Sequence, residues 1–170
     1  LSPELMDAIA AHVARANAVC RELRSGDEVL VVFRGPDAYI SPNWYPSKHE
    51  QHRQVPTWNY IVAHAHGRAT VRDDERYLRG LVGRLTKRHE ASQPRPWRMG
   101  DSPQEFIQQM MASIVGIEVA IERLVGKSKL SQNKERRDAE GAVQGLKSLG
   151  QDQIADEMTA RIAHRPDGSS

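Results

Sequence analysis

The sequence predicts an α+β fold built on a small mixed sheet or barrel. Short apolar or alternating stretches indicate four strands, and stretches with apolar residues every three or four positions indicate helices between and after them. The strand edges need partners, which favours a paired or closed sheet. At 170 residues the chain is long enough for one domain with a sizeable core, and a second independent domain is not expected.

Composition narrows the class of partner and the compartment. The chain has 24 Lys and Arg against 22 Asp and Glu, a formal charge of +2, so bulk charge does not select its partner. Its single cysteine, Cys20, excludes an internal disulfide and fits burial better than nucleophilic chemistry. No apolar run approaches the roughly 20 residues of a membrane span, and no leader pattern opens the chain. We therefore expect a soluble, cytoplasmic protein without membrane contact.

The first third of the chain predicts one helix and two strands. Apolar residues three or four apart over Leu5–Leu23 indicate an amphipathic helix, which Gly26 ends. The segment Glu28–Phe33 is short, β-branched and nearly all apolar, as in a strand buried on both faces. A turn at Arg34–Asp37 then leads to a second strand at Ala38–Ser41.

The middle of the chain predicts a long strand followed by a helix. The alternation over Thr57–Val71 indicates a strand with two usable faces, bent or bulged at Gly67. The acidic residues Asp73–Glu75 suit the N-terminus of a helix that ends at the cations Lys87–His89. Its apolar stripe consists of Leu78, Leu81, Val82 and Leu85.

The last third predicts three helices and one more strand. Ser102–Glu105 has the pattern of a capping box with Pro at the first helical position, opening a helix that runs to Ile114. The period changes to two over Ile117–Glu122, which indicates a strand with one face wet or facing a partner. Helices at 135–149 and 151–163 follow. We assign residues 1–150 to the main domain and 151–170 to a C-terminal helix and polar tail.

Aromatic residues concentrate in the segment Tyr39–Tyr60. It holds two of the three tryptophans, three of the four tyrosines and three prolines of a chain that is only 5% aromatic. A loop of this length usually binds a ligand or is disordered, and disorder disfavours aromatics, so we interpret it as an ordered binding loop. The equally weighted alternative is that the rings close the end of a core.

Three common kinds of site are not supported. Gly126-Lys127-Ser128 lacks the upstream glycine of a P-loop because residue 121 is Ile, and no G-x-G-x-x-G follows a strand. His64 and His66 share a strand face, but no carboxylate accompanies them, so we favour hydrogen-bonded histidines over metal ligands. The further histidines considered with that pair are His12, His49 and His52.

A polar run follows the last predicted strand. Lys127–Lys134 packs three lysines, two hydroxyls and two amides into eight positions, which offers donors to an anion or to the polar edge of a heterocycle. A solvated strand end with helix-capping residues is the favoured alternative if the run stands alone. Arg15 and Asn17 could likewise hold a phosphate or form ordinary surface. Together with the aromatic loop, these clusters suit a flat, anionic, aromatic ligand, for which flavin mononucleotide (FMN) is the obvious candidate.

Five motifs in a fixed order resemble the PaiB-type FMN-binding negative transcriptional regulators. The motifs are Y-I-S-P-N-W-Y-P-S-K at 39–48, V-P-T-W-N-Y at 55–60, H-A-H-G at 64–67, V-G-I-E at 115–118 and K-L-S-Q-N at 129–133. The resemblance as a whole extends over about residues 8–149. The resemblance implies an FMN-binding split β-barrel of the pyridoxamine-phosphate-oxidase group, with FMN in the interface of a homodimer. It also implies strands ahead of Leu1, and a strand at Ala8–Ala14 followed by a helix from Asn17, in place of one continuous helix.

The resemblance also implies a set of cofactor-binding residues. Arg15 and Lys129 are expected at the FMN phosphate, with Asn17 beside Arg15. Ser131, Gln132 and Asn133 are expected as hydrogen-bonding neighbours. The residues expected along the isoalloxazine ring or the dimer seam come from the aromatic motifs, and they are Tyr39, Ser41, Trp44, Tyr45, Trp58 and Asn59.

The implied function is that of an FMN-binding, homodimeric negative transcriptional regulator. DNA contact has little support in the sequence, because no helix-turn-helix pattern and no clustered basic stripe stand out. The alternatives are an FMN-dependent oxidoreductase, in which the flavin carries the redox chemistry, and a cofactor-free dimeric ligand-binding module on the same fold.

Overall fold

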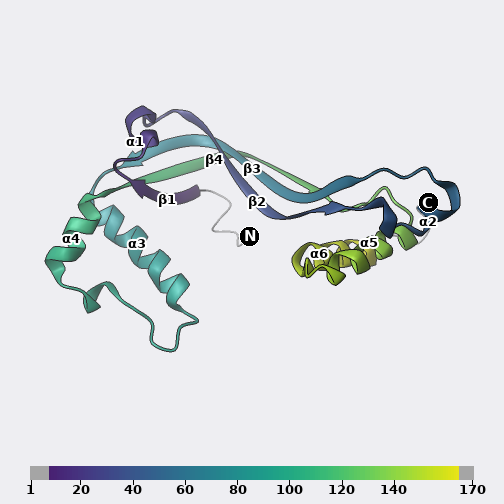
Figure 1. Ribbon diagram of the computed structural model, residues 1–170. Helices are drawn as coiled ribbons and strands as arrows, with labels where there is room; N and C mark the ends of the chain where they lie inside the picture. Colours follow the sequence, from purple (N-terminus) through teal and green to yellow (C-terminus); the bar gives the residue numbers. More distant parts are fainter. Residues whose placement is uncertain (1–7, 165–170) are drawn as a thin grey trace. The chain divides into compact units, whose positions relative to one another are not determined.

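The computed structural model describes residues 8–164 as an antiparallel sheet with helices (Figure 1). The strands are β1 Ala8–Ala14, β2 Glu28–Ile40, β3 Thr57–Arg72 and β4 Ile114–Lys129. The α-helices are α1 Ala18–Glu22, α2 Pro46–Gln51, α3 Glu75–Glu90, α4 Gln104–Ala112, α5 Arg136–Ser148 and α6 Asp152–Ala163. Short 3-10 helices lie at η2 Pro42–Trp44 and η3 Met99–Asp101.

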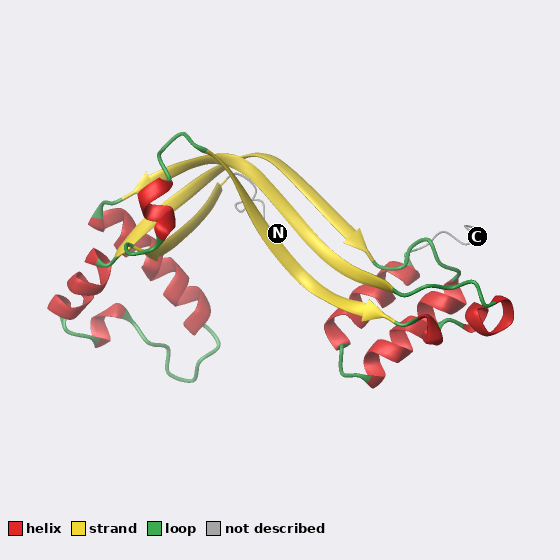
Figure 2. Ribbon diagram, turned by 45° about the horizontal axis from the view of Figure 1, so that its top comes forward, coloured by secondary structure: helices red, strands yellow, loops and turns green. Residues whose placement is uncertain are grey.

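The four strands form one sheet in the order β1-β4-β3-β2 (Figure 2). β1 is antiparallel to β4, with Ala8 opposite Ala120 and Ala14 opposite Ile114. Close approach of β3 to β4 explains one glycine, since a Cβ on Gly67 would overlap the carbonyl oxygen of Ala120. Because β2 stands last in the strand order, it is an edge strand of the described sheet.

The described residues form two compact units, which we describe separately. Unit 1 contains residues 8–31 and 65–124, and unit 2 contains residues 32–64 and 125–164. In unit 1 the apolar stripe of α3 packs on α4, and the core consists of Leu78, Ile107 and Met111 with Val82, Met99 and Ile114 against it. This confirms the predicted stripe of α3, whose N-cap Asp74 accepts a hydrogen bond from the Tyr77 backbone.

Unit 2 encloses the larger core. Its centre is the fully buried Tyr45 and Ile40, packed against α5 and α6 through Ala142, Leu146, Ile154, Ala155 and Met158. The ring of Trp44 lies on α5, where a Cβ at Gly145 would overlap it. Both predicted C-terminal helices are confirmed, whereas the predicted polar tail and the first residues of the chain lie outside the described residues.

Several local predictions were wrong. Leu5–Leu23 is not one helix, because Ala8–Ala14 pairs along its whole length with β4, and this tertiary pairing overrides the helical period. The strand at Ala8–Ala14 and the helix after Asn17, which the family resemblance implied, are confirmed. Arg34–Asp37 is not a turn but part of β2, whose position at the edge tolerates the missing N–H of Pro36.

Two further boundaries differ from the prediction. The capping box at Ser102–Glu105 is absent: Pro103 occupies the N-cap of α4 and offers no side-chain acceptor, and α4 ends at Ala112. The last strand runs from Ile114 to Lys129 rather than over Ile117–Glu122, so it includes the first three residues of the polar run that we placed after it. The long aromatic loop is also shorter than expected, because η2 and α2 occupy part of it.

Candidate functional site

The alternation of β2 and β3 in unit 2 sends neighbouring site residues to opposite faces. Trp58 is 50% exposed while Asn59 beside it is fully buried, and Tyr39 is 49% exposed while Ile40 is fully buried. The predicted aromatic site therefore splits into two groups. We call Tyr39, Trp58, Tyr60, Lys127 and Lys129 the open face, and Tyr45, Asn59 and Ser131 the buried face.

The open face begins with an ordered pair of rings. Tyr39 meets Trp58 edge to face, with ring centroids 6.3 Å apart and planes at 65°. The indole Nε1 of Trp58 donates to Asp37 Oδ1 at 2.9 Å, and Arg34 pairs with the same carboxylate at 3.1 Å. A hollow of about 360 Å³, lined by Arg34, Asp37, Trp58 and Tyr60 among others, lies here, within the usual range of small-molecule sites.

Two lysines supply positive charge to the same face. Lys129 Nζ donates to the Trp58 carbonyl at 2.9 Å and to the Thr57 hydroxyl, and since an ammonium has three donors, one remains for an anion. Lys127 Nζ lies 5.7 Å from the centre of the Tyr60 ring. Half-exposed rings next to cations are the chemistry that a flat, anionic, aromatic ligand requires.

The buried face holds the fold of unit 2 together. Asn59 Nδ2 donates to Ser131 Oγ at 2.9 Å and to Met158 Sδ at 3.3 Å, and Asn59 Oδ1 is buried without a hydrogen-bond partner. Ser131 has a positive φ of 61°, so the hydrogen bond stabilises a conformation that L-residues rarely adopt. Burial raises the pKa of the Tyr45 phenol, although contact with Ser131 opposes that shift.

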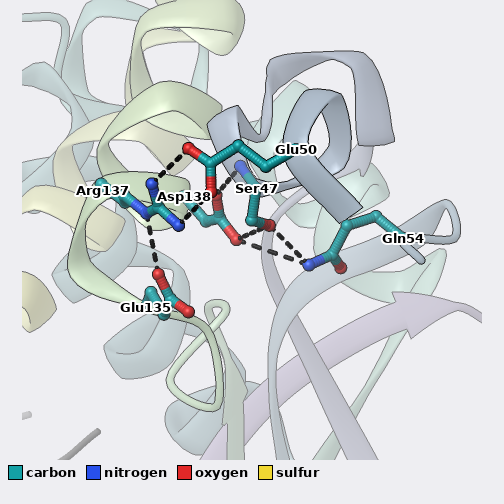
Figure 3. Close-up of polar contacts among 6 residues, drawn as sticks. All are labelled: Ser47, Glu50, Gln54, Glu135, Arg137 and Asp138. Atoms are coloured by element: carbon teal, nitrogen blue, oxygen red, sulfur yellow. Dashed lines mark hydrogen bonds and ion pairs between the residues drawn. The ribbon is translucent and has the colours of Figure 1, made fainter. Parts of the chain in front are cut away.

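A buried carboxylate joins α2 to α5 (Figure 3). Asp138 is only 1% exposed, and it accepts hydrogen bonds from the Ser47 backbone at 3.0 Å and from the Ser47 hydroxyl at 2.6 Å. Gln54 donates to Ser47 Oγ at 2.8 Å, and Lys134 donates to Gln54 Oε1 at 2.6 Å while lying 5.0 Å from the Tyr45 ring centre. The network fixes the segment that carries Trp44 and Tyr45.

An exposed ion pair lies beside this network. Arg137 binds both carboxylate oxygens of Glu50, at 2.6 and 2.8 Å, and donates to Glu135 (Figure 3). The hydrogen bond from Arg137 lowers the pKa of Glu50. This pair adds a second connection between α2 and α5.

The other predicted residues of unit 2 make local contacts. Ser41 caps η2 by accepting from the Asn43 backbone at 3.2 Å. Gln132 closes the turn after β4, since its Oε1 accepts from the Leu130 backbone at 2.6 Å and its Nε2 donates to the Ser128 carbonyl at 2.5 Å. Asn133 is exposed, and Trp44 packs on α5.

Arg15 and Asn17 belong to unit 1, and the structure gives both a local role. Arg15 makes two hydrogen bonds to Asp73, at 2.8 and 2.5 Å, and further ones to the carbonyls of Ala112 and Ile114. Four of its five N–H donors therefore have protein partners. Asn17 caps α1 by accepting from the Val19 backbone at 3.0 Å. Phosphate binding by Arg15 stays a prediction.

Other site classes find no geometric support in residues 8–164. That part of the chain contains no group of three or more His, Cys, Asp or Glu arranged to hold a metal ion. None of its helices has the length and apolar character needed to cross a bilayer.

Comparison with known families decides the assignment. The family model described as "Putative FMN-binding domain" matches residues 3–123. The chain belongs to this FMN-binding family. One relative of the FMN-binding chain is the Bacillus subtilis "Protease synthase and sporulation protein PAI 2", which is 30% identical over 140 residues, 82% of this chain and 65% of the relative. The PaiB-type resemblance of the motifs is thereby confirmed.

Two further comparisons extend this result. An uncharacterized Aspergillus fumigatus protein is 36% identical over 162 residues, 86% of this chain and 61% of that protein. The FAD and heme binding protein from Mycobacterium smegmatis has a similar structure, with a TM-score of 0.53 at 17% identity over 78% of this chain and 58% of that one. The predicted α+β flavin-binding split barrel is confirmed as the fold. The FMN-binding chain spans less than two thirds of the length of these relatives.

Sequence reasoning missed several residues at the site. Asp37 and Arg34 were assigned to a turn, yet Asp37 orients the Trp58 indole. Tyr60 could have been found from the alternation Trp58, Tyr60, Val62 along β3. No local pattern marks Asp138, because its partner Ser47 lies 91 positions away. The open face offers chemistry that suits the cofactor of the FMN-binding family: exposed rings, a remaining donor of Lys129 and, beside Trp58 and Tyr60, a hollow whose lining includes Arg34 but neither lysine.

Proposed function

We propose that this chain is a homodimeric, FMN-binding negative transcriptional regulator of the PaiB type that holds FMN on the open face of unit 2. The observation that carries the proposal is the combination of two half-exposed, mutually ordered rings, Tyr39 and Trp58, with the remaining donor of Lys129. Membership of the FMN-binding family supports it.

Each residue of the open face has a defined task. Trp58 and Tyr39 provide apolar ring surface for the flavin, and Asp37 holds the Trp58 indole in one orientation. Lys129 and Lys127 provide the positive charge that a phosphate group requires. When bound, FMN supplies redox chemistry at its isoalloxazine ring.

A homodimer is supported by apolar side chains at the surface of unit 2. Val32, Phe33 and Val125 are 48%, 48% and 42% exposed, and Val32 lines the same hollow as Trp58. Exposed apolar surface of this kind is typical of an interface. A partner subunit placed there would enclose a ligand that one open face leaves in contact with solvent.

A regulatory role is supported by the family relationship. The Bacillus subtilis relative is named for protease synthesis and sporulation, and it is 30% identical to this chain over 140 residues. We therefore propose that the flavin-loaded dimer represses transcription.

One purification tests these points together. The protein should carry stoichiometric FMN, identified after denaturation by its absorbance and by chromatography against FAD and riboflavin. Sedimentation should give the mass of a dimer, and the protein should lower expression from its own promoter in a reporter strain. A colourless monomer that does not take up added FMN would contradict the proposal.

A further inference from the structure

The segment Arg84–Arg98 of unit 1 concentrates more positive than negative charge. It contains Arg84, Lys87, Arg88, Arg95 and Arg98 against the single acid Glu90, whereas the whole chain has a formal charge of only +2. We call these five cations the basic surface. They lie on the second half of α3 and on the loop that follows it (Figure 1). All five are exposed.

The charges of the basic surface differ from those of other arginines in the chain. Arg15, Arg72 and Arg137 are paired with Asp73, Glu118 and Glu50 at 2.5, 3.2 and 2.6 Å. Between residues 8 and 164, no carboxylate lies within ion-pair distance of any of the five cations. Glu90 is the one acid of the segment, and its Oε2 accepts a hydrogen bond from the Trp97 backbone at 2.9 Å, so five cations against one carboxylate leave a formal excess of four positive charges.

Helix stability explains only part of this arrangement. Lys87 and Arg88 lie in the last turn of α3, where cations suit the helix dipole. Arg84 precedes that turn, and Arg95 and Arg98 follow the helix, so the dipole gives no reason for them. Lys87 and Arg98 nevertheless line one hollow of about 590 Å³ together with Glu90 and Trp97, which brings one cation of the helix and one of the loop to a common surface.

The chemistry of the basic surface favours phosphates of a polymer over a lipid surface. Four of the five cations are arginines, whose planar guanidinium groups bind phosphate through two parallel hydrogen bonds. A helix that binds a membrane lays an exposed apolar face into the lipid. The apolar stripe of α3 is not available for this, because Leu78 and Leu81 are 2% and 3% exposed in the core of unit 1.

We infer that the basic surface binds the phosphate backbone of duplex DNA. The inference rests on the proposed regulatory function and names the surface through which that function contacts its target. Contacts to phosphates position a protein on DNA without reading its sequence, so the basic surface supplies affinity and leaves sequence reading to other residues.

The test compares two variants that lose the same charge. In the surface variant Arg88, Arg95 and Arg98 become Gln. In the control variant Arg21→Gln, Arg53→Gln and Arg161→Gln remove three exposed arginines that have no ion pair in the described chain. Binding to a labelled mixed-sequence duplex of about 30 base pairs is followed by fluorescence anisotropy between about 50 and 200 mM KCl.

The parent protein should bind the duplex with a steep salt dependence. In the surface variant the slope of log affinity against log salt should fall by about 2 to 3, with affinity at least about tenfold weaker at 100 mM KCl. The control variant should keep the parent slope. The inference is overturned if the parent does not bind the duplex, or if both variants lose affinity equally.

Two further measurements complete the test. Competition by lipid vesicles distinguishes a membrane from DNA as the partner, and flavin content with molecular mass distinguishes failure of this inference from failure of the proposed function. Vesicles of phosphatidylserine and phosphatidylcholine should not compete with the duplex, and tight vesicle binding that the surface variant loses would overturn the inference in favour of a membrane. Flavin content and mass are measured on the same samples. A flavin-loaded dimer that ignores DNA contradicts only this inference, whereas a flavin-free protein that binds DNA through Arg88, Arg95 and Arg98 contradicts only the flavin proposal.

Discussion

One carboxylate contact of unit 1 and one of unit 2 lie in different environments. In unit 1 the Arg15–Asp73 pair lies at the surface, with side chains 46% and 53% exposed. In unit 2 Asp138 is 1% exposed and binds Ser47, which is 2% exposed. A surface pair is screened by water, whereas removing a buried acceptor leaves buried donors without partners. The carboxylate of Asp73 is therefore expected to add little to stability, whereas the carboxylate of Asp138 is expected to add much more.

The largest expected effect is at the buried carboxylate. Asp138→Ala removes the acceptor for both the backbone and the hydroxyl of Ser47, and we expect a loss of about 3 kcal/mol in the free energy of unfolding, measured with urea. Asp138→Asn keeps one acceptor oxygen in place and should lose less. A loss below about 1 kcal/mol for the alanine variant would mean that the network does not hold α2 on α5.

A smaller effect is expected where Trp44 lies on α5. A Cβ at Gly145 would overlap the Trp44 ring, so Gly145→Ala should destabilise unit 2 by about 1–3 kcal/mol despite the better helix propensity of alanine. The matched control is Gly80→Ala in α3 of unit 1, where only the Arg84 side chain comes near, at 3.4 Å. That variant should gain roughly 0.5–1 kcal/mol. Equal effects at both positions would show that Trp44 moves freely.

The smallest effect is expected at the surface pair of unit 1. The hydrogen bond from Arg15 lowers the pKa of Asp73, so the pair stabilises the fold above the unfolded pKa of about 4 and loses this contribution as pH falls through the lower folded pKa. Asp73→Asn should cost less than about 1 kcal/mol at pH 7.

This difference between parent and Asp73→Asn should also shrink in about 1 M salt, where exposed charges are screened. Urea unfolding of both proteins between pH 7 and pH 3 measures it. A difference that stays constant over that range would show that ionisation of Asp73 does not contribute.

The sequence predicted the elements whose signal is local. The amphipathic stripe of α3 and the alternation over Thr57–Val71 both correspond to observed elements, because burial of one face imposes the period directly. Ala8–Ala14 was predicted wrongly from its period, since its structure depends on pairing with β4, whose residues opposite it lie 100 to 112 positions away. Only the comparison of whole motifs with a family carries that information.

The site was predicted less completely because the face on which each side chain lies depends on strand alternation and on packing against distant helices. The residue types of the aromatic motifs indicated a flavin, but the prediction placed all of them along the isoalloxazine ring or the dimer seam. The strand alternation instead puts Trp58 in the open and Asn59 in the core, and packing on α5 engages Trp44. The basic surface escaped notice because its five cations are spread over a helix and a loop, and no single periodic pattern covers both.

The most direct measurement is a titration of the apoprotein with FMN, comparing Trp58→Leu with Trp44→Leu. If FMN lies on the open face, Trp58→Leu should weaken FMN binding at least about tenfold while the free energy of unfolding changes by less than about 0.5 kcal/mol. Trp44→Leu should instead lower stability and leave the FMN affinity of the folded protein nearly unchanged. Parental FMN affinity in the Trp58 variant, with weakened binding in the Trp44 variant, would contradict the open face as the flavin site.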